Sequence, residues 1–277
     1  MRWGAGLLVL LVLAGPGCAS SSAVPRLDGA VGMADAGPGV EAGALDGQLA
    51  DAASADGALQ PDAAPCAIAQ GQSPTLDGTG DYSEYLASQH VNVGAPQGST
   101  DVAAITWDPS ALYVTVTSDA FGGAFEPLHV YLEARAATLP AASASTGKEY
   151  GGLTPALPFT PTHLIAARRQ TDSGTGGPYD GVYTPTAAWA TRSFALEPGS
   201  HVFTSTDLHT LSVRTPWSAL GGCPTRLRLA AHVVHNVVAN EWKDTLPSTH
   251  TPWLAPGGGY YEIDLTAATA VAGWTLR

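Results

Sequence analysis

The sequence predicts an all-β fold for residues 66–277, a two-sheet antiparallel β-sandwich of jelly-roll type. Two observations predict it. Short runs rich in Val, Thr, Leu and Tyr recur along the chain, separated by Gly, Pro, Asn and Asp, which is typical of sandwiches. The clearest run, LYVTVT at residues 112–117, alternates apolar with Tyr and Thr residues, which is the period of a half-buried strand.

We expect ten strands from such runs. They are Ser88–Val93, Val102–Trp107, Leu112–Ser118, His129–Ala134, His163–Arg169, Ala187–Phe194, His201–Ser205, Thr210–Thr215, Leu227–Asn236 and Tyr260–Asp264. Two long loop-rich insertions interrupt them, at Thr138–Pro161 and Thr171–Gly181. Long loops on a rigid sandwich are where binding usually resides.

The N-terminus indicates export. Residues 1–17 have a basic start, a short apolar run and small residues before Cys18, as in a signal peptide. GPGC at residues 15–18 resembles a bacterial lipoprotein box, which implies a lipid on Cys18 and an outer-membrane or cell-surface location. Gly15 and Pro16 depart from that pattern, so cleavage near Ala19–Ser22 with a periplasmic or secreted product is the alternative.

The segment 18–65 is interpreted as a disordered tether. Residues 19–65 are almost wholly Ala, Gly, Asp, Ser and Pro, without an aromatic residue. Such a composition buries too little apolar surface to offset its conformational entropy. The tether would join the anchor to the domain; an acidic binding tail is the alternative.

Composition and motifs exclude several function classes. The net charge of −12 without a basic patch argues against nucleic acid and against a membrane contact other than the N-terminal lipid. The sequence has no GxSxG, HExxH, Walker or dinucleotide motif, so we expect no enzyme. Paired carboxylates for glycoside hydrolysis meet only in space, and the sequence leaves that alternative open.

The two cysteines beyond Cys18 form an even pair in an exported domain. Cys66 opens the domain and Cys223 follows the WSALGG turn. In an oxidising compartment this predicts a disulfide, with two separate thiols as the alternative.

Several segments resemble family 9 carbohydrate-binding modules and their DOMON-like relatives, in the family's order. They are PTLDGTGDYSEY (Pro74–Tyr85), AITWDPSALYVTVTSD (Ala104–Asp119), HVYLEA (His129–Ala134), RTPWSALGG (Arg214–Gly222) and YYEIDL (Tyr260–Leu265). The resemblance implies a β-sandwich that binds a polysaccharide without catalysis.

Modules of this family stack a sugar between loop tryptophans. Trp242 and Trp253 lie in the polar, Pro-rich ANEWKDTLPSTHTPW, which we interpret as a loop, and are the first candidates. Trp189 is a third candidate, with Tyr179 and Tyr183 as auxiliaries. Trp107, Trp217 and Trp274 are interpreted as packing residues. The alternative is that the candidate tryptophans are buried as well and bind no sugar.

Acidic residues suggest a calcium site by the same resemblance. Asp77, Asp81 and Glu84, with Asp119 after the strand, offer the oxygen ligands that calcium prefers. The alternative is that Asp77 and Asp81 only form turns.

The histidines give weaker signals. His232 and His235 fall on opposite faces of their predicted strand, one facing the core and one outward, and so cannot share a metal. A DOMON-like haem would need a pair of histidines, because Met1 and Met33 lie outside the domain.

Together these expectations describe an exported, lipid-anchored, monomeric protein that binds a polysaccharide or envelope glycan, with no certain cofactor. An envelope scaffold that binds a protein through the same sandwich is the alternative. Exposed aromatic rings clustered around one concave surface would favour the glycan, and burial of both Trp242 and Trp253 would favour the scaffold.

Overall fold

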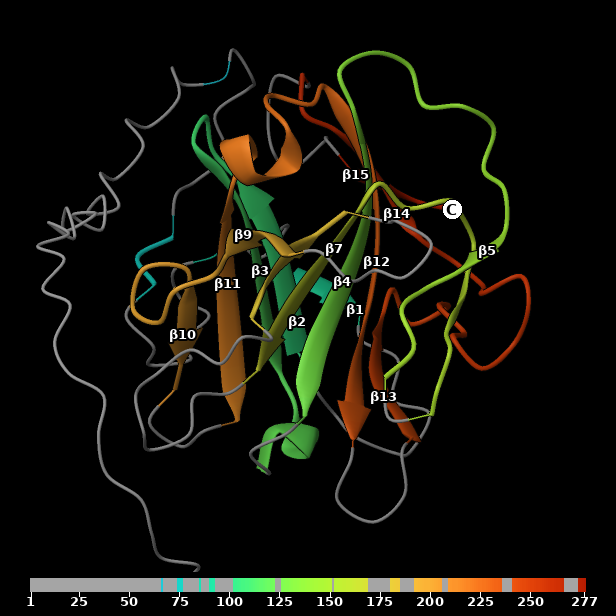
Figure 1. The fold of residues 1–277 in the computed structure, drawn as a ribbon, viewed down its shortest axis with the longest axis horizontal. Coiled ribbons are helices and arrows are strands. Elements are labelled where there is room, and N and C mark those ends of the chain that lie inside the picture. Colours follow the sequence, from blue (N-terminus) through green and yellow to red (C-terminus); the bar gives the residue numbers. More distant parts are fainter. Residues whose placement is uncertain are drawn as a thin grey trace, which may run out of the picture. The chain divides into compact units, whose positions relative to one another are not determined.

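The computed structural model describes residues 66, 74–76, 85, 90–92, 102–122, 126–150, 152–168, 180–184, 192–205, 209–235, 241–266 and 274–277. The predicted signal peptide, Cys18 and the predicted tether lie outside these residues. In the described part the fold is all-β, as expected, with two packed antiparallel sheets (Figure 1). No helix there is long and apolar enough to cross a membrane.

The smaller sheet has five strands. Its order is β1 (His90–Asn92), β2 (Val102–Trp107), β3 (Ala111–Thr117), β11 (Thr210–Pro216) and β10 (Val202–Thr204).

The larger sheet has eight strands. Its order is β15 (Trp274–Leu276), β14 (Tyr261–Asp264), β12 (Arg226–His235), β4 (Pro127–Arg135), β7 (His163–Arg168), β8 (Gly181–Tyr183) and β9 (Arg192–Ala195), with β13 (Glu241–Leu246) also paired to β12.

Every predicted strand overlaps an observed one, but the interpretation of residues 239–253 as a loop was wrong. Residues 241–246 form β13, which pairs with β12. Its alternation is hidden in the sequence because a register irregularity interrupts the pairing with β12 and Asp244 adopts a positive φ of 40°. The sequence also missed β8, β15 and the short pair β5 (Ser145–Thr146) and β6 (Ala156–Leu157).

The main core lies between the two sheets. Alternate apolar residues of β2, β3 and β11 meet those of β4, β7, β12 and β14. On β12 these are Leu227, Leu229, Ala231 and Val233, each fully buried. Burying a Leu or Val side chain contributes roughly 1.5–3 kcal/mol, so this interface supplies most of the apolar stabilisation.

The Trp-Asp and Pro-Trp motifs meet in one turn at the edge of this core. The Asp108 carboxylate accepts bonds from the Ala111 N–H at 2.8 Å and from the Tyr113 hydroxyl at 2.6 Å. The Trp217 indole N–H donates to the Asp108 carbonyl at 2.8 Å. Trp107 and Trp217 are both buried, which confirms their packing role, so these motifs position strands.

The expected disulfide is present. Cys66 and Cys223 are joined across 157 residues, with Cα atoms 5.4 Å apart. Cys66 is buried in the main core, and its N–H donates to the Pro109 carbonyl at 2.8 Å. In the chain-entropy model a loop of this length contributes up to about 5 kcal/mol.

Two segments lie on the outer face of the larger sheet. We call the described parts of residues 136–162, together with residues 247–260, the cover. Its first segment carries β5 and is the light-green loop in Figure 1, with the orange-red second segment beside it. The Ala156 N–H donates to the Pro252 carbonyl at 2.9 Å and so joins the two segments.

Candidate functional site

Polar and aromatic side chains share the outer face of the larger sheet. The register pairs Arg228 with Glu133, Ala230 with Tyr131 and His232 with His129. Because side chains alternate along a strand, these residues point away from the main core. They lie beneath the cover and are buried, so a second, smaller interior exists on this side.

Three buried histidines meet in this second interior, and we call them the histidine cluster: His129 from β4, His232 from β12 and His250 from the cover. The ring of His232 lies 5.7 Å from that of His129 and 5.6 Å from that of His250, centre to centre. Trp242 packs edge-on against His232 at 4.7 Å. Thus the histidines come from three separate parts of the chain.

Two hydrogen bonds place the protons of His250 and His232. The carbonyl oxygen of Gly257 can only accept, so the His250 Nδ1–H donates to it, at 2.7 Å. In a neutral ring His250 Nε2 is then an acceptor, and the His232 Nδ1–H donates to it at 3.3 Å. This leaves the lone pair of His232 Nε2, which is buried without a hydrogen-bond partner.

Burial keeps these rings neutral. Desolvation lowers the pKa of His129 to about 3 and that of His250 to about 4. The pKa of His232 lies well below its usual value, first through desolvation and then through its two histidine neighbours. Around the cluster, the charged side chain that adds to these effects is Lys148, which lowers the pKa of His129 further.

A buried ion pair lies farther along the same face. Arg228 Nη1 donates to Glu133 Oε2 at 2.8 Å, and Arg228 Nη2 donates to the Pro140 carbonyl of the cover at 2.7 Å. The guanidinium also lies 5.5 Å from the centre of the Tyr260 ring. These contacts tie both cover segments to β12.

The predicted glycan-binding residues have different positions. Trp242 is buried against the histidine cluster, and Tyr183 is buried on β8, with Lys148 Nζ 5.7 Å from its ring centre. Trp253 is exposed, with 43% of its surface accessible. One candidate of the predicted pair is therefore buried and the other exposed. Trp189 and Tyr179 lie outside the described residues, as does the side chain of Trp274.

Trp253 lies in a turn of the cover whose backbone is fixed by hydrogen bonds. The Leu254 N–H donates to the Thr251 carbonyl at 2.9 Å, and the Thr251 N–H to the Gly257 carbonyl at 2.9 Å. Gly257 has a φ of 92°, and a Cβ there would lie 2.6 Å from the backbone of Leu157. Only glycine fits this contact between the two cover segments.

Of the predicted calcium ligands, Asp119 is exposed just after β3, and Asp77, Asp81 and Glu84 lie outside the described residues. Next to Asp119, the hydroxyl of Ser118 donates to the Asp244 carboxylate, which is fully buried. The described part of the chain holds no group of three or more His, Cys, Asp or Glu side chains arranged for a metal ion.

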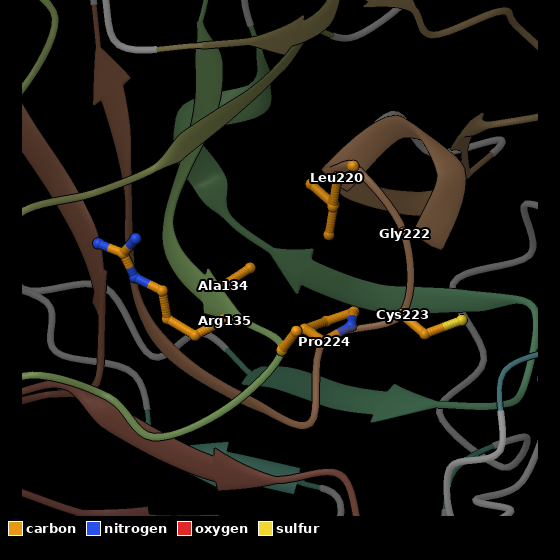
Figure 2. Close-up of a pocket in the computed structure, with 8 residues that line it drawn as sticks. Ala134, Arg135, Leu220, Gly222, Cys223 and Pro224 are labelled. Carbon is orange, nitrogen blue, oxygen red and sulfur yellow. The ribbon is translucent and has the colours of Figure 1, made fainter.

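A small cavity of about 180 Å³ lies at the edge of the sandwich, away from the histidine cluster. It is lined by Ala134–Ala136 and Leu220–Pro224. Figure 2 shows the Cys223 sulfur pointing away from Arg135 and Leu220. Its lining is mostly small residues and backbone, with no cluster of titratable side chains to suggest chemistry.

Comparison of the chain with family models, with curated proteins and with solved structures gave no match.

The histidine cluster was missed by the sequence because its members are separated by up to 121 positions, from His129 to His250. His232 was expected to face either the core or the solvent, whereas it faces a second interior. One signal was present: HVYLEA and RLRLAAHVVH both place His, Tyr, Glu or Arg on the face opposite the apolar one. Two paired strands whose outer faces both carry such polar and aromatic residues indicate that another segment of the chain covers these faces. The side chain of His235 lies outside the described residues.

Proposed function

We propose that this protein is a non-catalytic carbohydrate-binding protein that uses the turn around Trp253 as its platform. The single observation that carries the proposal is an indole that is 43% exposed on a turn held by backbone hydrogen bonds. A flat apolar face that is already ordered can stack on the C–H side of a sugar ring at little entropic cost. The resemblance to family 9 carbohydrate-binding modules points to the same ligand class.

The same proposal places the protein outside the cytoplasm. The N-terminal pattern supports export and a lipid on Cys18, and the low-complexity segment after it supports a flexible tether. The disulfide between Cys66 and Cys223 fits an oxidising compartment. An anchored domain of this kind would hold the cell surface near a polysaccharide, or bind a glycan of the envelope itself.

The second candidate is an envelope module that binds a protein. One observation favours it: Leu254, next to Trp253, is 58% exposed, and an adjacent Trp and Leu can enter a hydrophobic pocket of a partner. A sugar would use the flat ring of Trp253 and gain little from Leu254. The two candidates therefore differ in how much Leu254 matters.

The test is a pull-down of the full chain on cellulose, xylan, chitin and peptidoglycan, with and without a calcium chelator. We expect at least one to bind, Trp253→Ala to abolish that binding, and Leu254→Ala to retain it. Trp253→Phe, which keeps a smaller ring, should retain part of the affinity. Absence of binding across the panel, or equal binding by Trp253→Ala, would overturn the proposal.

A further inference from the structure

The Trp253 turn is attached to the sheet in an unusual way. A cover segment usually docks through apolar side chains, yet the second segment docks at this point through a histidine. His250 lies three residues before Trp253 and is fully buried. It connects the turn, through the Gly257 carbonyl, to His232 on β12.

The apolar contacts of the cover lie mainly in its first segment. Leu157 and Phe159 pack on Tyr131, Leu164 and Ala230, in a cluster separate from the main core. The second segment adds Tyr260, which packs on Phe159 with ring centres 5.6 Å apart. Because these contacts are separate from the core between the sheets, the cover can open without unfolding the sandwich.

The hydrogen-bond chain requires a neutral cluster. A proton on His250 Nε2 would point at the Nδ1–H of His232, so His232 would have to move its own proton to Nε2, which has no partner. The new charge would also be buried, facing His232 and, beyond it, His129, Trp242, Tyr131, Tyr150 and Lys148. Among the described residues, no carboxylate contributes to the pKa of His232 or His250, so these neighbours do not offset the charge.

We propose that His250 is an acid-sensitive anchor of the cover: neutral, it holds the Trp253 turn on the sheet, and protonation of the histidine cluster releases that turn. If the anchor controls ligand binding, that role rests on the proposed function. The acid-induced release of the turn does not depend on the proposed function, because it concerns only the contact of the cover with the sheet.

The pH range follows from the direction of the pKa shifts. In the closed form the pKa of His250 is lowered to about 4, while in the open form water restores its usual value. The open form therefore binds more protons as the pH falls from about 6.5 towards 4, and acid favours opening. Between about pH 7.5 and about pH 5 the opening equilibrium should rise roughly 30-fold for each histidine that becomes exposed.

Hydrogen exchange of the full chain measures this opening without any ligand. The reporters are the amides of Thr251, Leu254 and Gly257, which are bonded within the turn, and the reference is β3. After correction for intrinsic rates, we expect protection of the turn to fall roughly 30-fold between about pH 7.5 and about pH 5, while the turn stays less protected than β3 at both values. Turn amides as protected as those of β3, which would then exchange only through global unfolding, would overturn the proposal, and so would turn protection that does not change with pH.

Two variants locate the effect. His250→Gln keeps a side-chain donor for the Gly257 carbonyl but cannot titrate. It should reduce the acid step, by which we mean the loss of hydrogen-exchange protection in the turn between about pH 7.5 and about pH 5. His201→Gln is the matched control, since His201 is half-buried beside Phe194 before β10 and its pKa is also lowered by burial. It should leave the step unchanged. An unchanged step in His250→Gln would overturn the proposal, and if that variant does not fold, the wild-type comparison still decides.

Binding of the same polysaccharides at the two pH values separates the two proposals. Weaker binding in acid by the wild type but not by His250→Gln supports both. If no polysaccharide binds at either pH but the turn opens in acid, the proposed function fails and the acid-sensitive anchor stands. If a polysaccharide binds through Trp253 equally at both pH values and the turn stays closed, the anchor fails and the function stands.

Discussion

The two faces of β12 are both buried, yet they are built from different side chains. The inner face carries Leu227, Leu229, Ala231 and Val233 against the smaller sheet. The outer face carries Arg228, Ala230 and His232 beneath the cover. One strand thus separates an apolar interior from a titratable one.

This difference teaches that burial alone does not identify the stabilising core. Apolar contacts on the inner face are independent of pH and salt to first order. On the outer face, buried polar groups are held by partners: Arg228 is held by Glu133 and His232 by His250. Stability should therefore respond to pH and to charge changes through the outer face, and to volume changes through the inner one.

The largest effect should come from acid. Global unfolding exposes His129, His232 and His250, whose pKa values are lowered in the folded state. The unfolded chain binds more protons below about pH 6.5, so stability falls from there until the folded rings titrate, by about 2 kcal/mol per ring at about pH 5. Urea unfolding at several pH values measures it. A flat profile between about pH 7.5 and 5 would show that the outer face does not behave as described.

Next comes the ion pair of the outer face. Glu133→Gln removes the partner of Arg228 and leaves a buried guanidinium near Glu262, 3.7 Å away. We expect the free energy of unfolding to drop by about 3 kcal/mol, because the partly exposed Glu262 compensates the buried charge only in part. Glu262→Gln, the same change at a partly exposed site, should cost less than about 1 kcal/mol. Equal losses in the two variants would contradict this reading.

On the inner face, Leu229→Ala should cost about 3 kcal/mol, since it leaves a cavity between the sheets. The loss should be the same at about pH 7.5 and pH 5, because the core cluster that contains Leu229 consists of apolar and aromatic side chains. Chemical denaturation at both values tests it. A cost that changes with pH would erase the distinction between the two faces.

The smallest effect on stability is expected at the surface of the cover. Trp253→Ala should change the free energy of unfolding by less than about 0.5 kcal/mol, because the ring is exposed. Polysaccharide binding, in contrast, should disappear. Thermal unfolding run beside the pull-down measures both effects. Trp242→Ala is the comparison, because loss of that buried ring should lower the free energy of unfolding by about 3 kcal/mol.

Local patterns determined the sandwich. Alternation in residues 112–117 and in the strands around His129 and Leu227 predicted strands that the structure contains, because a period of two is set by the backbone alone. The pairing of Cys66 with Cys223 followed from their number and the exported context. β13 was not foreseen, because its irregular pairing with β12 and the positive φ of Asp244 hide its alternation.

The candidate site was decided only by the tertiary structure. The sequence singled out Trp253 as a ring suited to sugars, but whether that ring or Trp242 is exposed depends on where the cover lies. Likewise His129, His232 and His250 are unremarkable singly, and their protonation matters only once the cover excludes water from all three. Periodicity is local and readable, whereas burial of a polar group is a property of everything packed around it.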